Sequence, residues 1–169
     1  MTYLNKRILE VGCGNNINYP FRPRVKYYPL AYYWFCDLHP NPDLGILYCN
    51  VEERLPFPKD YFDEVYMSHV LEHLNNPLWA LKEVYRVLKP GGILHIWVPN
   101  WFSPNAKNDP GHKHTFNVVT LSRLMRRAGF RVGWTINLPH NIPIKIRKWI
   151  WLFTSLFVDE LYLMGVKPE

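Results

Sequence analysis

The chain has 169 residues, of which 48% are hydrophobic, so its length and apolar content predict a single domain, 1–169, with a packed core. It has no uninterrupted apolar run of about 18 residues and no apolar stretch behind its first basic residues, so we expect neither a spanning helix nor a signal peptide, but a soluble, cytoplasmic protein. The formal charge of +6 favours anionic partners, although solubility alone explains it equally well.

Short apolar segments alternate with helical ones through the first 100 residues. The pattern predicts strands at residues 7–11, 32–37, 45–49, 62–67 and 92–98. Such alternation indicates a parallel sheet covered by helices.

Two helices carry clear start and stop signals. The first is predicted at residues 77–88, with Asn76 as cap and one apolar face made of Leu81, Val84, Tyr85 and Leu88. The second is predicted at residues 118–128, with Asn117 as cap and Gly129 as terminator. Lys-Pro-Gly-Gly at 89–92 is expected to end the first helix and turn into the next strand.

The C-terminal third is expected to hold a strand at 130–138, a basic and aromatic helical insertion at 144–157, and a last strand at 160–166. The insertion has cations at its start and tryptophans in its body, as an interfacial helix in peripheral contact with a membrane does, but it is too short to span a bilayer. Packing of the same tryptophans onto the sheet is the competing hypothesis.

The three cysteines, Cys13, Cys36 and Cys49, are an odd number with no paired CxxC spacing. This pattern favours neither a disulfide framework nor a zinc knuckle. We therefore predict three reduced, small apolar side chains.

A glycine turn and a distant carboxylate are the first candidate site residues. Gly12, Cys13 and Gly14 follow the first strand directly, where glycine lets a ligand approach the backbone closely. Asp37 ends the second strand, where a nucleotide-binding sheet places a carboxylate for ribose hydroxyls. Taken separately, an ordinary tight turn and a solvated loop aspartate explain the same residues.

Four further motifs follow in order: Leu-Pro-Phe-Pro at 55–58, Phe-Asp at 62–63, Val-Leu-Glu-His-Leu at 70–74 and Arg-Val-Leu-Lys-Pro-Gly-Gly at 86–92. With the glycine turn, this series resembles the class I S-adenosylmethionine (SAM)-dependent methyltransferases. The resemblance implies an α/β, Rossmann-like, mostly parallel seven-stranded sheet with an antiparallel last strand and helices on both faces. It also implies SAM as cofactor and S-adenosylhomocysteine as product.

By this resemblance, nine positions bind the cofactor: Glu10, Gly12, Cys13, Gly14, Asp37, Leu38, Asn50, Val51 and Ser68. Asp37 would hold the ribose diol and Leu38 would cover the adenine. The family commonly has an aspartate where this chain has Asn50, whose amide oxygen still accepts a hydrogen bond.

The chain departs from the family between residues 15 and 31. Asn16 replaces the usual third glycine, three prolines follow, and no amphipathic first helix is readable, so the first helical region is expected to be reduced. Basic residues in the same stretch would then supply the charge that a helix end normally offers, namely Arg22, Arg24 or Lys26.

Histidines are the candidate catalytic residues. The resemblance places His69 beside the transferred methyl group, and His112 and His114 in the acceptor region, where an imidazole would orient or deprotonate a hydroxyl; a surface pair is the alternative. His69 and His73 also spell the HxxEH zinc-protease motif, but the stretch follows a strand and is broken by Pro77, so we expect no metal.

The resulting prediction is in-line methyl transfer to a small-molecule or lipid/glycan-linked acceptor, with anionic acceptors favoured by the charge. A catalytically inactive SAM-binding or scaffold protein of the same fold is the alternative from another class. Methylation of RNA ranks lower, because no base-reading module is recognisable. The sequence leaves the oligomeric state open.

Overall fold

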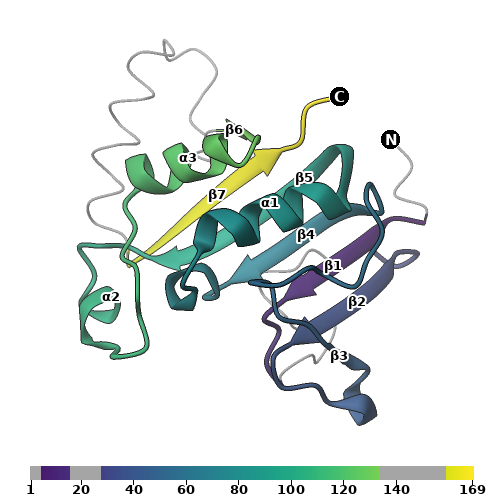
Figure 1. Ribbon diagram of the computed structural model, residues 1–169, viewed down its shortest axis with the longest axis horizontal. Helices are drawn as coiled ribbons and strands as arrows, with labels where there is room; N and C mark the ends of the chain where they lie inside the picture. Colours follow the sequence, from purple (N-terminus) through teal and green to yellow (C-terminus); the bar gives the residue numbers. More distant parts are fainter. Residues whose placement is uncertain (1–4, 16–27, 134–158) are drawn as a thin grey trace.

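The computed structural model describes residues 5–15, 28–133 and 159–169. Within these ranges one sheet has the strand order β3-β2-β1-β4-β5-β7-β6 (Figure 1). Its strands are β1 (Arg7–Val11), β2 (Tyr32–Asp37), β3 (Ile46–Tyr48), β4 (Phe62–Ser68), β5 (Leu88–Pro99), β6 (Arg131–Gly133) and β7 (Glu160–Val166). The first five pair in parallel and β7 is antiparallel to both β5 and β6, which confirms the predicted sheet.

The two predicted helices form, each with its predicted cap. The helix α1 (Pro77–Val87) begins where the Asn76 side chain accepts a hydrogen bond from the Trp79 amide, 3.1 Å away. The helix α3 (Val118–Arg127) begins with a reciprocal capping box between Asn117 and Thr120. Three short elements were not predicted: α2 (Pro104–Asn108) and the 3-10 helices η1 (Pro42–Leu44) and η2 (Leu71–His73).

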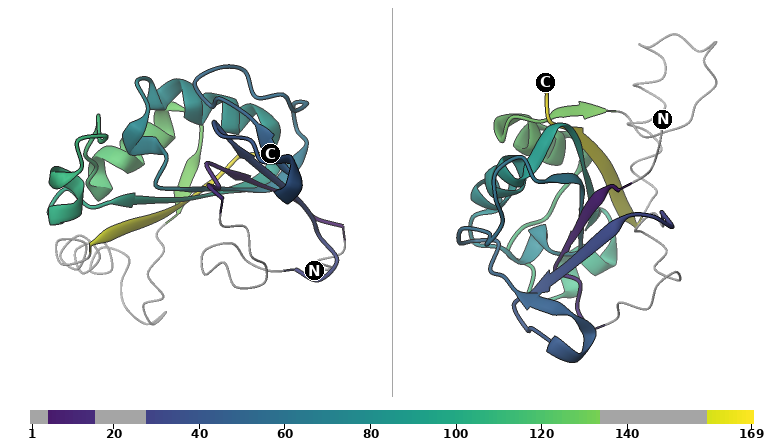
Figure 2. Two further views of the ribbon diagram at one scale, coloured as in Figure 1. Left: turned by 90° about the horizontal axis from the view of Figure 1, so that it is seen from below. Right: turned by 90° about the vertical axis from the view of Figure 1, so that its right-hand side faces the viewer.

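The main core lies between the sheet and these two helices. Figure 2 shows α1 and α3 on the same side of the sheet, where Leu81 and Leu121 are fully buried in one core cluster with Leu9 and Val65 of the central strands. Because side chains alternate along a strand, Ile8 joins a separate cluster on the opposite face. No long helix covers that face within the described ranges; the expectations for 15–31 and 144–157 fall almost entirely on residues outside them.

The fifth strand begins earlier than predicted. It starts at Leu88, directly after α1, because Leu88 pairs with Phe62 of β4 before the register shifts at Glu64. The Lys-Pro-Gly-Gly segment therefore lies inside β5. Of the strand predicted at 130–138, only Arg131–Gly133 is described, and no helix in the described ranges is both long and apolar enough to cross a bilayer.

The prediction of three reduced cysteines is wrong for two of them. Cys36 and Cys49 form a disulfide, with their Cα atoms 5.5 Å apart, whereas Cys13 is a free, buried thiol. The two bridged residues lie 13 positions apart, but β2 and β3 are neighbours in the sheet, with Asp37 opposite Tyr48. The spacing gave no sign of this pairing, because the contact exists only through the sheet.

Candidate functional site

The glycine turn after β1 has the backbone that only glycine adopts easily. Gly12 and Gly14 have φ angles of +69° and +58°. A Cβ atom on Gly12 would lie 2.2 Å from Cγ2 of Val70, whereas one on Gly14 would meet no atom within 4 Å. The turn therefore packs closely on Val70 at Gly12 and is open at Gly14.

The carboxylate of Asp37 lies against this turn. The Gly14 amide donates to Oδ2 over 2.9 Å, and the His39 amide donates to Oδ1 over 3.0 Å. Each carboxylate oxygen retains a lone pair for a further donor. The two places that the sequence singled out, 23 residues apart, thus meet in the fold.

A cavity of about 330 Å³ opens beside these residues, at the carboxyl ends of the parallel strands. Its volume falls within the usual range for small-molecule sites. Five predicted cofactor-binding residues line it: Gly12, Asp37, Leu38, Asn50 and Val51. The predicted catalytic residue His69 lines it as well.

Four predicted cofactor-binding residues do not line this cavity. Gly14 is linked to the cavity through the hydrogen bond of its amide to Asp37, and Cys13 is buried in the core. Glu10 alternates with Val11 along β1 and so faces the opposite side of the sheet, where it is buried. Ser68 is the last residue of β4, directly before His69. The cofactor-binding roles of all nine residues remain predictions.

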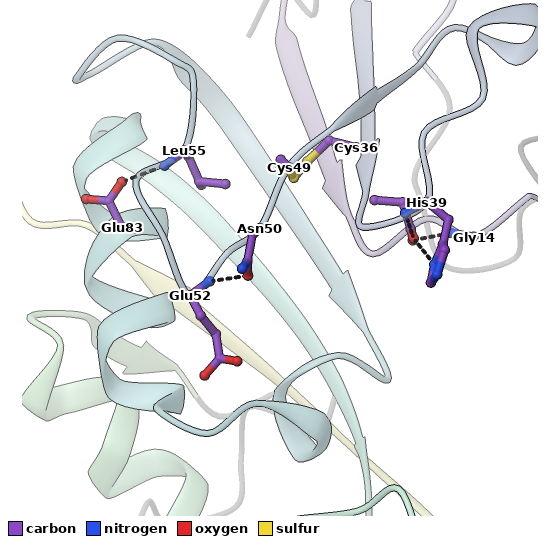
Figure 3. The surroundings of a disulfide bond; sticks show 9 residues. Gly14, Cys36, His39, Cys49, Asn50, Glu52, Leu55 and Glu83 are labelled. Carbon is purple, nitrogen blue, oxygen red and sulfur yellow. Dashed lines mark hydrogen bonds and ion pairs between the residues drawn. A yellow bond between two sulfur atoms is a disulfide. The ribbon is translucent and has the colours of Figure 1, made fainter.

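The far wall of the cavity is built by the turn after β3. The Asn50 side chain accepts a hydrogen bond from the Glu52 amide, 3.0 Å away, and its amide group donates to Glu53. Figure 3 shows the disulfide with Gly14 and His39 to one side and this turn to the other. Because the Asn50 oxygen has a second lone pair, it can still accept from a ligand amino group.

His69 is held between two carboxylates. Its Nδ1 lies 3.2 Å from Oε1 of Glu72, and its Nε2 lies 2.7 Å from Oε1 of Glu160. The hydrogen bond to Glu72 raises the pKa of His69, burial opposes this, and the bond to Glu160 adds to the rise, so that the net shift is upward. Because both ring nitrogens are engaged by carboxylates and the charged form is favoured, His69 is held in place and is not arranged to act as a free base.

A second, open cavity of about 570 Å³ adjoins the first at His69. It is lined by His69, Pro99, Asn108, Asp109, Pro110 and His112. His112 thus lines a cavity, and its role toward an acceptor remains a prediction. His114 lines neither cavity and donates its backbone amide to the Glu72 carbonyl.

The zinc-protease arrangement suggested by HxxEH does not form. Only Leu71–His73 is helical, as a single 3-10 turn, whereas that motif needs a long helix to carry two histidines on one face. His69 instead pairs with Glu72 and Glu160.

The residues around the first cavity fit SAM. Gly12 contributes bare backbone to the cavity lining, and the Asp37 carboxylate offers acceptors to the two ribose hydroxyls. Leu38, which is 54% exposed, and Val51 supply apolar surface for an adenine ring.

Sequence reasoning missed several residues of the site. Val70, His73 and Leu74 line the first cavity and belong to a motif that the sequence had already singled out. Lys113 and Glu160 had no local signal, because they reach the site from the loop before α3 and from the start of β7.

Comparison with known proteins places the chain in a family. Residues 3–133 match the methyltransferase domain family. A probable S-adenosylmethionine-dependent methyltransferase of Mycolicibacterium smegmatis is 35% identical in an alignment of 143 residues that covers 79% of this chain and 55% of that protein. A ubiquinone/menaquinone biosynthesis C-methyltransferase of Neisseria meningitidis is 52% identical over 44 residues, which are 26% of this chain and 18% of that protein. The chain thus spans about half, or less, of the length of these relatives.

Solved structures show the same fold. A Haloferax volcanii protein solved in complex with the Trm112 methyltransferase activator has a TM-score of 0.70 at 18% identity, over 99% of this chain and 84% of that one. A SAM-dependent methyltransferase from Archaeoglobus fulgidus has a TM-score of 0.62 at 20% identity, over 96% and 86% of the two chains. These likenesses support the Rossmann-like sheet and no finer statement.

Proposed function

Because the chain belongs to the methyltransferase domain family, among the class I SAM-dependent methyltransferases, we propose that it transfers a methyl group from SAM to a small-molecule or lipid/glycan-linked acceptor. The observation that carries the proposal is the meeting of the Gly14 amide with Asp37 at the mouth of a cavity of about 330 Å³. The acceptor would enter through the second cavity, which adjoins the first at His69.

Bound SAM would supply an electrophilic methyl group on a sulfonium. The main role of the chain would then be to position the cofactor and the acceptor relative to each other. Asp37 and Asn50 would hold the nucleoside by hydrogen bonds, while Leu38 and Val51 bracket its base. His69, fixed between Glu72 and Glu160, forms a rigid wall at the boundary of the two cavities. Holding two reactants in line contributes about 7 to 11 kcal/mol in favourable cases, so a strong general base is not required.

The second cavity suits a compact, polar acceptor. It is open to solvent and has an exposed carboxylate, Asp109, at its rim beside His112. A small molecule, or the head of a larger lipid- or glycan-linked molecule, reaches such a site without a dedicated binding domain.

The ribose site is tested by calorimetry with SAM and S-adenosylhomocysteine. We expect Asp37→Ala to weaken binding by about 10- to 100-fold, because a charged acceptor of two hydroxyl donors is lost. Asp43→Ala is the matched control, since it removes the same charge from an exposed position in η1, away from the cavity. Equal affinity in Asp37→Ala and the parent would remove the basis of the proposal.

The inactive-scaffold alternative is tested by turnover. With SAM and a mixture of small-molecule and lipid- or glycan-linked acceptors, the parent should release S-adenosylhomocysteine, and Asp37→Ala should release much less at limiting SAM. Tight SAM binding without release of S-adenosylhomocysteine in the presence of this mixture would favour the scaffold alternative.

A further inference from the structure

Three side chains with metal-binding atoms converge at the boundary of the two cavities. One carboxylate oxygen of Glu72 and one ring nitrogen each of His73 and His112 all lie within 4.8 Å of one another. His73 lines the first cavity and His112 the second, so the group lies between them. The sequence predicted no metal here, because the histidine pair that it offered was His69 with His73, on a stretch that follows a strand and is broken before Pro77.

Both histidines are oriented as metal ligands usually are. Nδ1 of His73 lies 3.0 Å from the Gly111 carbonyl oxygen, and Nδ1 of His112 lies 3.3 Å from the Ala106 carbonyl oxygen. A carbonyl oxygen only accepts, so each Nδ1 is the donor, and Nε2 is the ring nitrogen left to hold a metal ion. Backbone carbonyls holding the far nitrogen are the usual outer support of a ligating histidine.

The carboxylate of Glu72 is buried and incompletely paired. The residue is 1% exposed, and Oε1 faces His69, but Oε2 has no hydrogen-bond partner within the described ranges. A buried carboxylate oxygen without a donor is costly, since it has lost its water. A bound cation would satisfy it.

Backbone hydrogen bonds hold the segment that carries His112 next to the one that carries Glu72. The amides of Lys113 and His114 donate to the Glu72 carbonyl over 2.9 and 3.1 Å, which pins the loop before α3 to η2. His112 is thereby held beside Glu72, 40 positions earlier in the chain. The site is thus preformed by main-chain contacts and does not depend on flexible side chains alone.

We propose that Glu72, His73 and His112 bind one divalent transition-metal ion. Two imidazoles and one carboxylate are a donor set that takes Zn²⁺ when one position stays open, and that also accepts Fe²⁺ or Mn²⁺. Oδ2 of Asp109 lies 3.5 Å from Nε2 of His112, so a second carboxylate is near the same ion. Mg²⁺, which prefers oxygen ligands, should bind much more weakly.

The open position of the ion would face an acceptor in the second cavity, on the side lined by His112. An acceptor that presents an oxygen ligand, such as a hydroxyl or a carboxylate, would be held there next to the cofactor cavity. This role rests on the proposed function, whereas the metal site itself does not.

The test is calorimetric titration of the full chain, freed of metal by chelator, with ZnCl₂ and separately with MgCl₂. We expect one Zn²⁺ per chain and a loss of affinity of at least about 100-fold in Glu72→Gln and in His112→Ala. His114→Ala is the matched control, because it removes an imidazole from the same loop but outside the group. Circular dichroism and thermal melting of each metal-free variant show that it is folded.

Absence of saturable Zn²⁺ binding to the parent overturns the proposal, as does undiminished affinity in both Glu72→Gln and His112→Ala. Binding of Mg²⁺ as tightly as Zn²⁺ contradicts the assignment of the donor set. Titration of SAM into the same preparations separates the two proposals: Zn²⁺ binding without SAM binding leaves the metal site standing and removes the methyltransferase proposal.

Discussion

The contact between Gly12 and Val70 makes the glycine turn sensitive to one methyl group. In Gly12→Ala the new Cβ would lie 2.2 Å from Cγ2 of Val70, at a φ angle of +69°. The left-handed backbone costs a non-glycine residue about 1–2 kcal/mol. Overpacking adds about 1–3 kcal/mol, so we expect Gly12→Ala to lower the free energy of unfolding by about 2–5 kcal/mol.

Gly14→Ala isolates the backbone part of this cost. Gly14 has a similar φ angle, +58°, but a Cβ there meets no atom within 4 Å, so a loss of only about 1–2 kcal/mol is expected. Val70→Ala in the Gly12→Ala background should recover most of the difference, because it removes the methyl group that the new Cβ meets. The parent, Gly12→Ala alone, Val70→Ala alone and the double variant form a thermodynamic cycle.

The assay is urea unfolding of these four proteins and of Gly14→Ala, without cofactor, followed by fluorescence of the seven tryptophans. A midpoint for Gly12→Ala that matches that of Gly14→Ala would refute the packing argument. So would a double variant that is no more stable than Gly12→Ala alone. Either result would mean that the turn relaxes away from Val70.

Three further outcomes concern stability. A reductant should lower the melting temperature of the parent but not that of Cys49→Ser, which lacks the disulfide. For the 13-residue separation of Cys36 and Cys49, the disulfide is expected to stabilise the fold by about 3 kcal/mol. A parent whose melting temperature does not respond to the reductant would restore the prediction of free thiols. Burial alone would raise the pKa of Glu64, but His95, whose Nε2 lies 3.5 Å away, and hydrogen bonds from a lysine and two tyrosines hold the pKa well below 4.5. The stabilising effect of Glu64 is therefore complete above pH 4.5 and fades as the pH falls further. Glu64→Gln should therefore flatten the dependence of melting temperature on pH below 4.5, and an unchanged slope would contradict the assignment. Lys167→Met should lose about 2–3 kcal/mol in urea unfolding, because the buried ammonium of Lys167 donates to two backbone carbonyls, whereas Lys59→Met, at an exposed position, should lose almost nothing.

Local patterns were sufficient for most of the elements. The strands at Arg7–Val11, Tyr32–Asp37 and Glu160–Val166 have the predicted bounds, because a continuous apolar run flanked by turn residues has one stable conformation in a sheet. The caps at Asn76 and Asn117 were also predicted correctly, since the hydrogen bonds that cap a helix join residues only two or three positions apart in the chain. Where pairing across the sheet mattered, prediction failed, as at the start of β5.

The sequence by itself determined the family, the parallel sheet and the places of the glycine turn and Asp37, because each depends on residues that are close together in the chain or at a fixed spacing. Only the tertiary structure decided which side chains meet: Cys36 with Cys49, His69 with Glu160, and Glu72 with His112. Each of these contacts joins segments separated by 13 to 91 positions. They arise because the carboxyl ends of the parallel strands, the loops that follow them and the first residue of the antiparallel β7 lie at one edge of the sheet. A linear pattern does not encode that proximity.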